Sequence, residues 1–368
     1  MEHIFTKDIK RILIDEFEDK AEIIYSLCPI LQYINLKTKS VDRSSKSRSN
    51  YGNLYAIYVL VEDYVKKGFN KSGKYKDYEG ARFKDLFMRQ RELPFGEKLQ
   101  NHALNHRLNE EFRKYFPTLN YEPIIRDTQE NKYWFNENLL ICRIDNQEYN
   151  IAVSIIKIID EYIERKQKAF INFIKYCEQI MGFQYTENQL AVNFVIELLS
   201  PNVDARIFEI VSYSILKYYY HNQTVFFGFD LKSLKQENLI LYKTGRTNAN
   251  DGGIDFVMRP TGRFFQVTET TDIKKYFLDI DKVERYPITF VIKSNEDIRE
   301  LRDKIREKAS EQYPINAIVE KYMNCIEELI NLPILIQYFK KENNAGYLKD
   351  IVNEIVKQSK LEFNYESY

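Results

Sequence analysis

The chain has 368 residues, enough for two domains of ordinary size that each bury a core. Its 54 basic and 54 acidic residues cancel, so no overall positive charge indicates a polyanionic partner. Four widely spaced cysteines without a C-x-x-C pair argue against a disulfide framework or a zinc knuckle. We expect a protein of the reducing cytoplasm, because neither a leader-like start nor eighteen consecutive apolar residues occur.

The first half is expected to be mainly helical. Apolar residues recur at helical spacing in three stretches, residues 9–31, 54–65 and 151–181. Residues 139–142 and 149–151 flank the turn-like Asp145-Asn146, which predicts a β-hairpin before the third helix. Ser200-Pro201-Asn202 is typical of a boundary, so we place a domain junction at about residues 190–202.

Residues 36–115 have a local excess of positive charge, with eighteen Lys and Arg against ten Asp and Glu. Part of this excess lies in a Ser-rich run that contains Lys37, Lys39, Arg43, Lys46 and Arg48. The run could follow a phosphate backbone or could be a solvated loop. Nearby Tyr51, Tyr55 and Tyr58 could stack on bases, but their helical spacing favours core positions.

Residues 89–109 are rich in amides and arginine. We expect a helix after Pro94 and Gly96, with Asn101, Asn105 and Asn109 along one stripe. Arg, Asn and Gln are the side chains that pair bidentately with guanine and adenine edges, so this helix is a candidate for DNA recognition. The alternative is that its amides bond to loops and buried backbone. His102 and His106 have the spacing of a zinc pair but lack the intervening Glu of H-E-x-x-H.

After the junction the pattern changes to short strands between helices. A helix is expected at residues 205–220, followed by four strands at residues 224–229, 239–242, 254–258 and 264–268. These strands should form a mostly antiparallel sheet. A helix at 272–283, a strand at 288–292 and a helix at 295–311 follow, and the tail from Ile315 is expected to be helical with an interruption at Pro333.

The strongest chemical signal is Asp251-Gly252-Gly253-Ile254-Asp255. Its two glycines permit a tight turn that presents the Asp255 carboxylate at the start of an apolar strand. On the next strand, Gln266 and Thr268 share one face, and Val267 and Glu269 share the other.

This arrangement of oxygens suits Mg²⁺, a hard cation that takes few protein ligands and keeps several waters. Asp255 supplies a carboxylate, and a second oxygen ligand follows eleven positions later at Gln266. A Mg²⁺ ion there could acidify a bound water and neutralise charge on a phosphodiester. Glu209, on the helix before the sheet, is a further carboxylate that could hold a metal-bound water or a second ion.

Phe208-Glu209 on a helix, the D-G-G-I-D element and Phe265-Gln266-Val267-Thr268 resemble the Mrr-like branch of the PD-(D/E)XK nuclease superfamily. The resemblance covers roughly residues 205–294. It implies an α/β fold with a restriction-endonuclease-like core, a mixed central sheet flanked by helices, here preceded by a mainly helical domain. It also implies that Asp255, Gln266, the Val267 carbonyl and Glu209 hold Mg²⁺, and that the protein is a type II restriction endonuclease, usually a homodimer.

The chain departs from the family at Thr268, where the pattern Q-x-K has lysine. The missing charge could come from Lys243, Lys274 or Lys275. We favour Lys243, because its strand leads directly into the Asp255 turn. The predicted catalytic set is therefore Asp255, Gln266, Thr268, Glu209 and Lys243. The residues expected to contact DNA are Arg48, Arg89, Arg91, Gln100, Asn101, Asn105, Arg107, Arg246 and Asn248.

The expected organisation has three parts. Residues 1–195 would be a helical domain for target recognition, residues 196–300 the nuclease core, and residues 301–368 helices for support or dimerisation. The expected function is Mg²⁺-dependent, sequence-specific cleavage of double-stranded DNA. Two alternatives stay open: a modification-dependent nuclease, and a DNA-binding protein without catalysis, which Thr268 favours.

Overall fold

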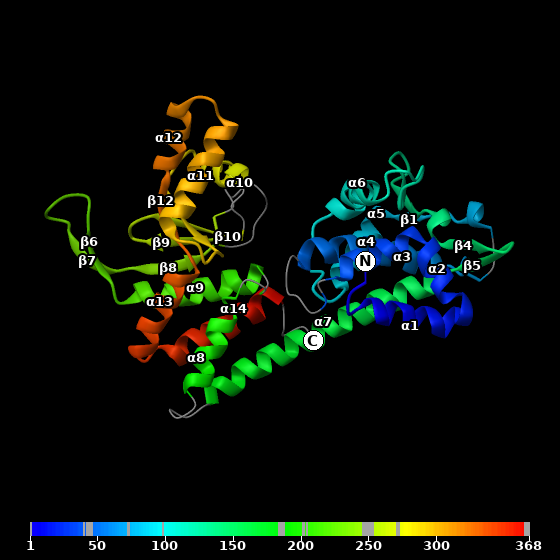
Figure 1. The fold of residues 1–368 in the computed structure, drawn as a ribbon, viewed down its shortest axis with the longest axis horizontal. Helices are drawn as coiled ribbons and strands as arrows, with labels where there is room; N and C mark the ends of the chain where they lie inside the picture. The colour runs from blue at the N-terminus through cyan, green and yellow to red at the C-terminus, as the bar shows by residue number, and fades with distance from the viewer. Residues whose placement is uncertain are drawn as a thin grey trace. The chain divides into compact units, whose positions relative to one another are not determined.

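The computed structural model describes residues 2–39, 41, 47–71, 74–97, 99–182, 188–200, 203, 205–244, 254–269 and 273–363. The chain divides into two compact units, Met1–Phe173 and Ile174–Tyr368. The division falls inside the long helix α7 (Ala152–Gly182), upstream of the junction expected at residues 190–202. Figure 1 shows the helices and strands of both units.

The first unit is mainly helical, and helices occupy the three stretches where helical spacing predicts them. Its helices are α1 (Thr6–Phe17), α2 (Ala21–Leu27), α3 (Pro29–Thr38), α4 (Ser47–Lys66), α5 (Phe83–Glu92), α6 (Leu108–Tyr115) and the first part of α7. Its short helical turns are η1 (Glu18–Lys20), η2 (Tyr75–Asp77), η3 (Ala103–Arg107) and η4 (Glu137–Leu139). A small antiparallel sheet has the order β1 (Ala81–Arg82), β3 (Lys132–Phe135) and β2 (Ile124–Asp127).

The β-hairpin expected before α7 is confirmed. Strands β4 (Ile141–Ile144) and β5 (Gln147–Asn150) pair antiparallel through the two-residue turn Asp145-Asn146. Both turn residues are left-handed, with φ of 50° and 63°. Asp and Asn tolerate this conformation better than most residues, and a two-residue turn of this kind matches the twist of the strands.

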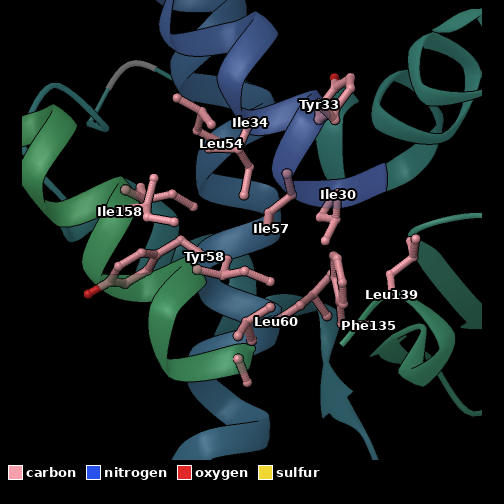
Figure 2. Packing of buried hydrophobic residues seen from close by; sticks show 14 of the residues in the cluster. Ile30, Tyr33, Ile34, Leu54, Ile57, Tyr58, Leu60, Phe135, Leu139 and Ile158 are labelled. Atoms are coloured by element: carbon pink, nitrogen blue, oxygen red, sulfur yellow. The ribbon is translucent and has the colours of Figure 1, made fainter. Parts of the chain in front are cut away.

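Helix α4 is the centre of the first core. Every described position from Tyr51 to Val61 is buried, so this helix is apolar nearly all round, and other elements cover all its sides. Figure 2 shows its side chains packed between α3, α7 and the strand that carries Phe135. Tyr51, Tyr55 and Tyr58 belong to this core. The core interpretation of the three tyrosines is confirmed, and they are not available to stack on bases.

Truncation in this core should be costly. Leu60 is fully buried, so we expect Leu60→Ala to lower the free energy of unfolding by about 2–5 kcal/mol, through lost burial and the cavity left behind. Ile14 lies in the same unit but is 51% exposed, so Ile14→Ala should change stability by less than about 1 kcal/mol. Urea unfolding followed by circular dichroism measures both. Equal losses would contradict the packing described.

The second unit is built on a five-stranded sheet. Its strand order is β12 (Ile326–Ile330), β11 (Ile288–Ile292), β10 (Arg263–Thr268), β9 (Phe256–Arg259) and β8 (Ile240–Lys243). β8, β9 and β10 pair antiparallel, whereas β10, β11 and β12 pair parallel. The sheet is therefore mixed, as expected of the fold class. Helix α10 (Ile273–Lys282) connects β10 to β11, which places it across one face of the sheet.

Three expectations for this unit are wrong. The strand expected at residues 224–229 does not join the main sheet: β6 (Thr224–Phe227) pairs with β7 (Lys235–Asn238) in a separate two-stranded ribbon. The tail is not entirely helical, because β12 adds a fifth strand beside β11. Pro333 also begins a helix instead of interrupting one, since it occupies the first turn of α13 (Leu332–Asn344), where a missing N–H has no cost.

Helices cover the sheet on both faces. The remaining helices of this unit are α8 (Asn188–Glu197), α9 (Ala205–His221), α11 (Ile298–Gln312), α12 (Asn316–Asn324) and α14 (Leu348–Phe363). α9 packs against β8, α13 and α14, and α10 packs against α11. Among the described helices of the whole chain, none combines the length and apolar character needed to cross a membrane.

Candidate active site

Charged and polar side chains gather at one edge of the five-stranded sheet. Lys243 ends β8, Asp255 directly precedes β9, and Thr268 ends β10. The pairing of the strands brings these ends together, because Lys243 lies opposite Phe256, the first residue of β9. We call this group the charged edge, and its members are Glu209, Lys243, Asp255, Gln266, Thr268, Glu269 and Lys293.

Glu209 and Lys243 form an ion pair. The Lys243 Nζ lies 3.1 Å from Glu209 Oε1, and both side chains are only 14% exposed. Helix α9 is aligned on β8 partly by Tyr213, whose hydroxyl donates to the Leu241 carbonyl at 3.3 Å. Burial raises the pKa of Tyr213 to about 12, so it remains a donor at neutral pH. Two residues predicted from separate segments are thus brought into contact.

The Asp255 carboxylate lies beside the backbone of β10. Its Oδ2 accepts a hydrogen bond of 2.7 Å from the Val267 N–H, and the Asp255 N–H donates to the Phe265 carbonyl at 3.0 Å. The Asp255 carbonyl in turn accepts from the Thr244 N–H at 2.9 Å. These bonds hold Asp255 next to the strand that carries Gln266, as the sequence predicts.

The side chains of the charged edge lie on two faces of the sheet. Phe256, opposite Lys243, contacts a tyrosine of α9, with 5.2 Å between ring centroids. Phe290, beside Gln266, contacts a tyrosine of α10 at 4.7 Å. Because side chains alternate along a strand, Gln266 and Thr268 face α10, whereas Lys243 and its partner lie on the α9 face. The five predicted catalytic residues therefore share an edge but not a face.

On the α10 face, Gln266 and Thr268 are both buried, at 7% and 3% exposed. The Gln266 Oε1 accepts no hydrogen bond from any residue that the structure describes. A buried oxygen without a donor is costly, unless a ligand occupies it. Lys275, in the first turn of α10, donates to Thr268 Oγ1 at 3.4 Å. A lysine thus lies beside the position where the family pattern has one.

A second ion pair at this edge was not predicted. The Lys293 Nζ contacts Glu269 Oε1 at 2.6 Å, bonds to the Val203 carbonyl and lies over the Phe208 ring at 5.6 Å from its centroid. Its side chain is only 3% exposed. A lysine placed directly after the strand 288–292, in which every residue except Thr289 is apolar, was the available sequence signal. It could not have identified Glu269 as its partner.

No family model, curated protein or solved structure matches this chain. Its site must therefore be judged on its own geometry. Within the described ranges, His, Cys, Asp and Glu side chains nowhere form a group of three or more that could hold a metal ion. Mg²⁺ needs fewer protein ligands than this, because it keeps several waters. Asp255, the bare Gln266 Oε1 and backbone carbonyls are hard oxygen donors, so the residues fit Mg²⁺ in donor chemistry.

The residues predicted to contact DNA have different surroundings. Arg89 makes a bidentate pair with Glu62, with both N–O distances at 2.9 Å, and Arg91 donates to the Glu97 carbonyl at 2.6 Å. Arg107 and Gln100 are exposed. The side chain of Arg48, and Arg246, Asn248 and the Asp251-Gly252-Gly253 turn, lie outside the described residues.

The helix expected from Gly96 onward begins later than predicted. Residues 97 and 99–101 form turns and coil, and helical structure starts at residue 102 with the π-helical turn η3, which leads into α6. The preceding turn is tight: a Cβ on Gly96 would lie 2.2 Å from the Gln90 carbonyl oxygen. Asn101 and Asn105 are partly exposed, whereas Asn109 is buried and bonds in both directions with the backbone of Ile124, at 2.9 Å. Asn109 fits the alternative of an amide bonded to buried backbone.

Lys37 is not part of a surface that could follow phosphates. It is 7% exposed and forms an ion pair with Glu111, which also accepts from Asn53 at 2.5 Å. Burial lowers the pKa of Lys37 despite this carboxylate. His102 and His106 are exposed, with 5.9 Å between ring centroids, and belong to no metal-binding group among the described residues.

Proposed function

We propose that this chain is a Mg²⁺-dependent endonuclease of double-stranded DNA, of the type II restriction class. The single observation that carries the proposal is the charged edge, where Asp255 is held against β10, the strand that carries the bare Gln266 Oε1. With the separate β6–β7 ribbon left aside, the order α9, β8, β9, β10, α10, β11 also supports it, because this order agrees with the core of the PD-(D/E)XK nucleases that the sequence resembles.

Several groups at and beside the charged edge have roles in this proposal. Asp255, Gln266 and the Val267 carbonyl would hold Mg²⁺. When bound, this ion would stabilise the negative charge that develops on the scissile phosphate. Lys275, beside Thr268, would bind a phosphate oxygen in place of the missing lysine. Lys243 would orient Glu209 through their ion pair, so Glu209 would act as a positioned carboxylate and not as a free one.

Incubation of the purified protein with plasmid DNA, with and without Mg²⁺, tests the proposal. We expect discrete fragments only in the presence of the metal. Binding without cleavage in Mg²⁺ or Mn²⁺ would favour the non-catalytic DNA-binding alternative, for which Thr268 is the supporting residue. Methylated and unmethylated copies of one plasmid distinguish the type II enzyme from a modification-dependent nuclease.

Arg107 should contribute to DNA binding through phosphate contacts. It is exposed at the end of η3, so Arg107→Ala should weaken binding to all sequences and reduce the salt slope of log affinity by about one unit. Arg89→Ala is the matched control: Arg89 is engaged by Glu62, so its removal should leave the salt slope unchanged. Fluorescence anisotropy across a salt series measures both. The same slope in wild type and Arg107→Ala would remove this surface from the proposed interface.

A further inference from the structure

The ribbon formed by β6 and β7 exposes an unusual amount of apolar surface. Among the described strands, these two pair only with each other. Five of the ribbon's apolar side chains are exposed, from 41% to 97%: Phe226, Phe227, Phe229, Leu231 and Leu234. Together they present on the order of 600 Å² of apolar surface, taking about 200 Å² for a whole Phe. Apolar surface of this extent exposed on one small element is typical of an interaction site.

The tip of the ribbon has a defined structure. Asp230 Oδ1 accepts from the N–H groups of Lys232 and Ser233, each at 2.8 Å. Ser233 Oγ accepts from the N–H groups of Phe229 and Asp230, each at 3.0 Å. A Cβ on Gly228 would lie 2.7 Å from the Ser233 carbonyl, so the two sides of the tip approach closely. Phe229 and Leu231, at 97% and 89% exposed, are thus held outward by an ordered turn.

The charges of the ribbon favour a partner of balanced charge. Its four charged residues are two acids, Asp230 and Glu237, and two lysines, Lys232 and Lys235. A nucleic acid backbone or an anionic membrane would be bound through a surplus of positive charge, which the ribbon lacks. Lys235 and Glu237 instead lie two positions apart on β7. They can therefore pair with Glu237 and Lys235 of a second β7 strand that runs antiparallel to the first.

We propose that the ribbon is the dimerisation arm of this chain and that its occupant is the ribbon of a second copy. The outer edge of β7 pairs antiparallel with β7 of the second copy about a two-fold axis at Gln236. Because of the two-fold symmetry, this register places Lys235 of each copy opposite Glu237 of the other. Phe226 shares the face of Gln236, because the two are cross-strand partners, so the Phe226 rings of both copies gather on one side of a four-stranded sheet.

The same register carries each tip to the base of the other ribbon. A hollow of about 450 Å³ lies at that base, lined by Gln223 and Leu239 together with Tyr220, Met258 and Pro287. Its lining is mixed: Tyr220, Leu239, Met258, Tyr286 and Pro287 provide aromatic and aliphatic contacts for Phe229 or Leu231 of the second copy, and Gln223, Thr261, Arg263 and Glu327 line the rest. The interface is self-complementary in three respects: the strand edge, the charge pair, and the tip with its hollow. None of these depends on the proposed nuclease activity.

Sedimentation equilibrium of the full chain tests the proposal. We expect wild type to have twice the mass of the chain. Lys235→Glu and Glu237→Lys should each weaken dimerisation at least about tenfold, because each places like charges opposite one another. The double exchange Lys235→Glu with Glu237→Lys should restore it, which only a second copy of the same strand explains. Leu231→Asp should also give monomers, whereas Ile315→Ser, at a site 57% exposed outside the ribbon, should not.

The proposal is overturned by a wild-type monomer at every concentration, by a dimer that the ribbon variants leave unchanged, or by a double exchange that does not restore association. Circular dichroism of each variant shows whether its fold is kept. In those cases, wild type and Leu231→Asp are compared in liposome flotation, with anionic and neutral vesicles, and in DNA binding. If wild type is monomeric and Leu231→Asp loses binding to vesicles or to DNA, the ribbon is assigned to that partner instead of a second copy.

Discussion

Asp255→Asn is expected to reduce Mg²⁺-dependent cleavage of plasmid DNA by at least about 100-fold while leaving the protein folded. The change removes the negative charge that would hold the metal. An Asn side chain keeps an oxygen that can accept the 2.7 Å hydrogen bond from the Val267 N–H, so the local structure of β10 should be retained. Cleavage rates across a Mg²⁺ series measure the effect.

Asp255→Ala separates the structural role of this residue from the chemical one. It removes the acceptor of the Val267 N–H as well as the charge, so it should lower thermal stability more than Asp255→Asn does. Glu300→Gln, at an exposed carboxylate in the first turn of α11 that the proposal does not assign to the metal, is the control for charge and should keep most cleavage. Full activity of Asp255→Asn would show that the metal assignment is wrong, even if the chain is a nuclease.

Lys293→Met is expected to lower the free energy of unfolding by about 2–3 kcal/mol. The Lys293 side chain is almost fully buried and neutralises Glu269, whose side chain is 29% exposed. The lysine also bonds to the Val203 carbonyl, so its loss should loosen the segment that leads into α9. Urea unfolding and hydrogen exchange of α9 measure the two effects.

Lys275→Met is the control for this prediction. Lys275 is exposed and lies beside the charged edge, next to Thr268, so its removal should change stability by less than about 0.5 kcal/mol. In the proposed nuclease it should nevertheless reduce cleavage, because it takes the place of the motif lysine beside Thr268. Equal losses of stability in the two variants would contradict the burial that distinguishes them.

Local patterns in the sequence were sufficient for most elements. Helical spacing located α4, α7 and α9, because an amphipathic or fully apolar repeat can bury its side chains in only a few ways. The Asp145-Asn146 turn was predictable because both residues adopt left-handed backbone readily. The approach of Asp255 to the strand of Gln266 was also predictable, since neighbouring strands joined by a short turn must pair.

The sequence patterns did not predict the elements whose stability comes from neighbouring strands. β7 is polar and fully exposed, and β12 lies in a tail that is otherwise helical, so neither has the composition of an isolated strand. β7 forms because β6 supplies its hydrogen bonds, and β12 forms because β11 offers a free edge. Similarly, the basic composition near Lys37 indicated a surface, whereas Glu111, 74 residues away, allows this lysine to be buried.

By itself, the sequence identified the candidate site residues and the short segments that hold them: Asp255 at the start of a strand, Gln266 and Thr268 on one strand, and Glu209 on a helix. Only the tertiary structure decided that Glu209 is paired with Lys243, that Gln266 faces α10, and that Lys293 neutralises Glu269. The physical reason is that periodicity and turn chemistry act over a few residues. Ion pairs and faces depend on strand register and helix packing, which join positions tens of residues apart.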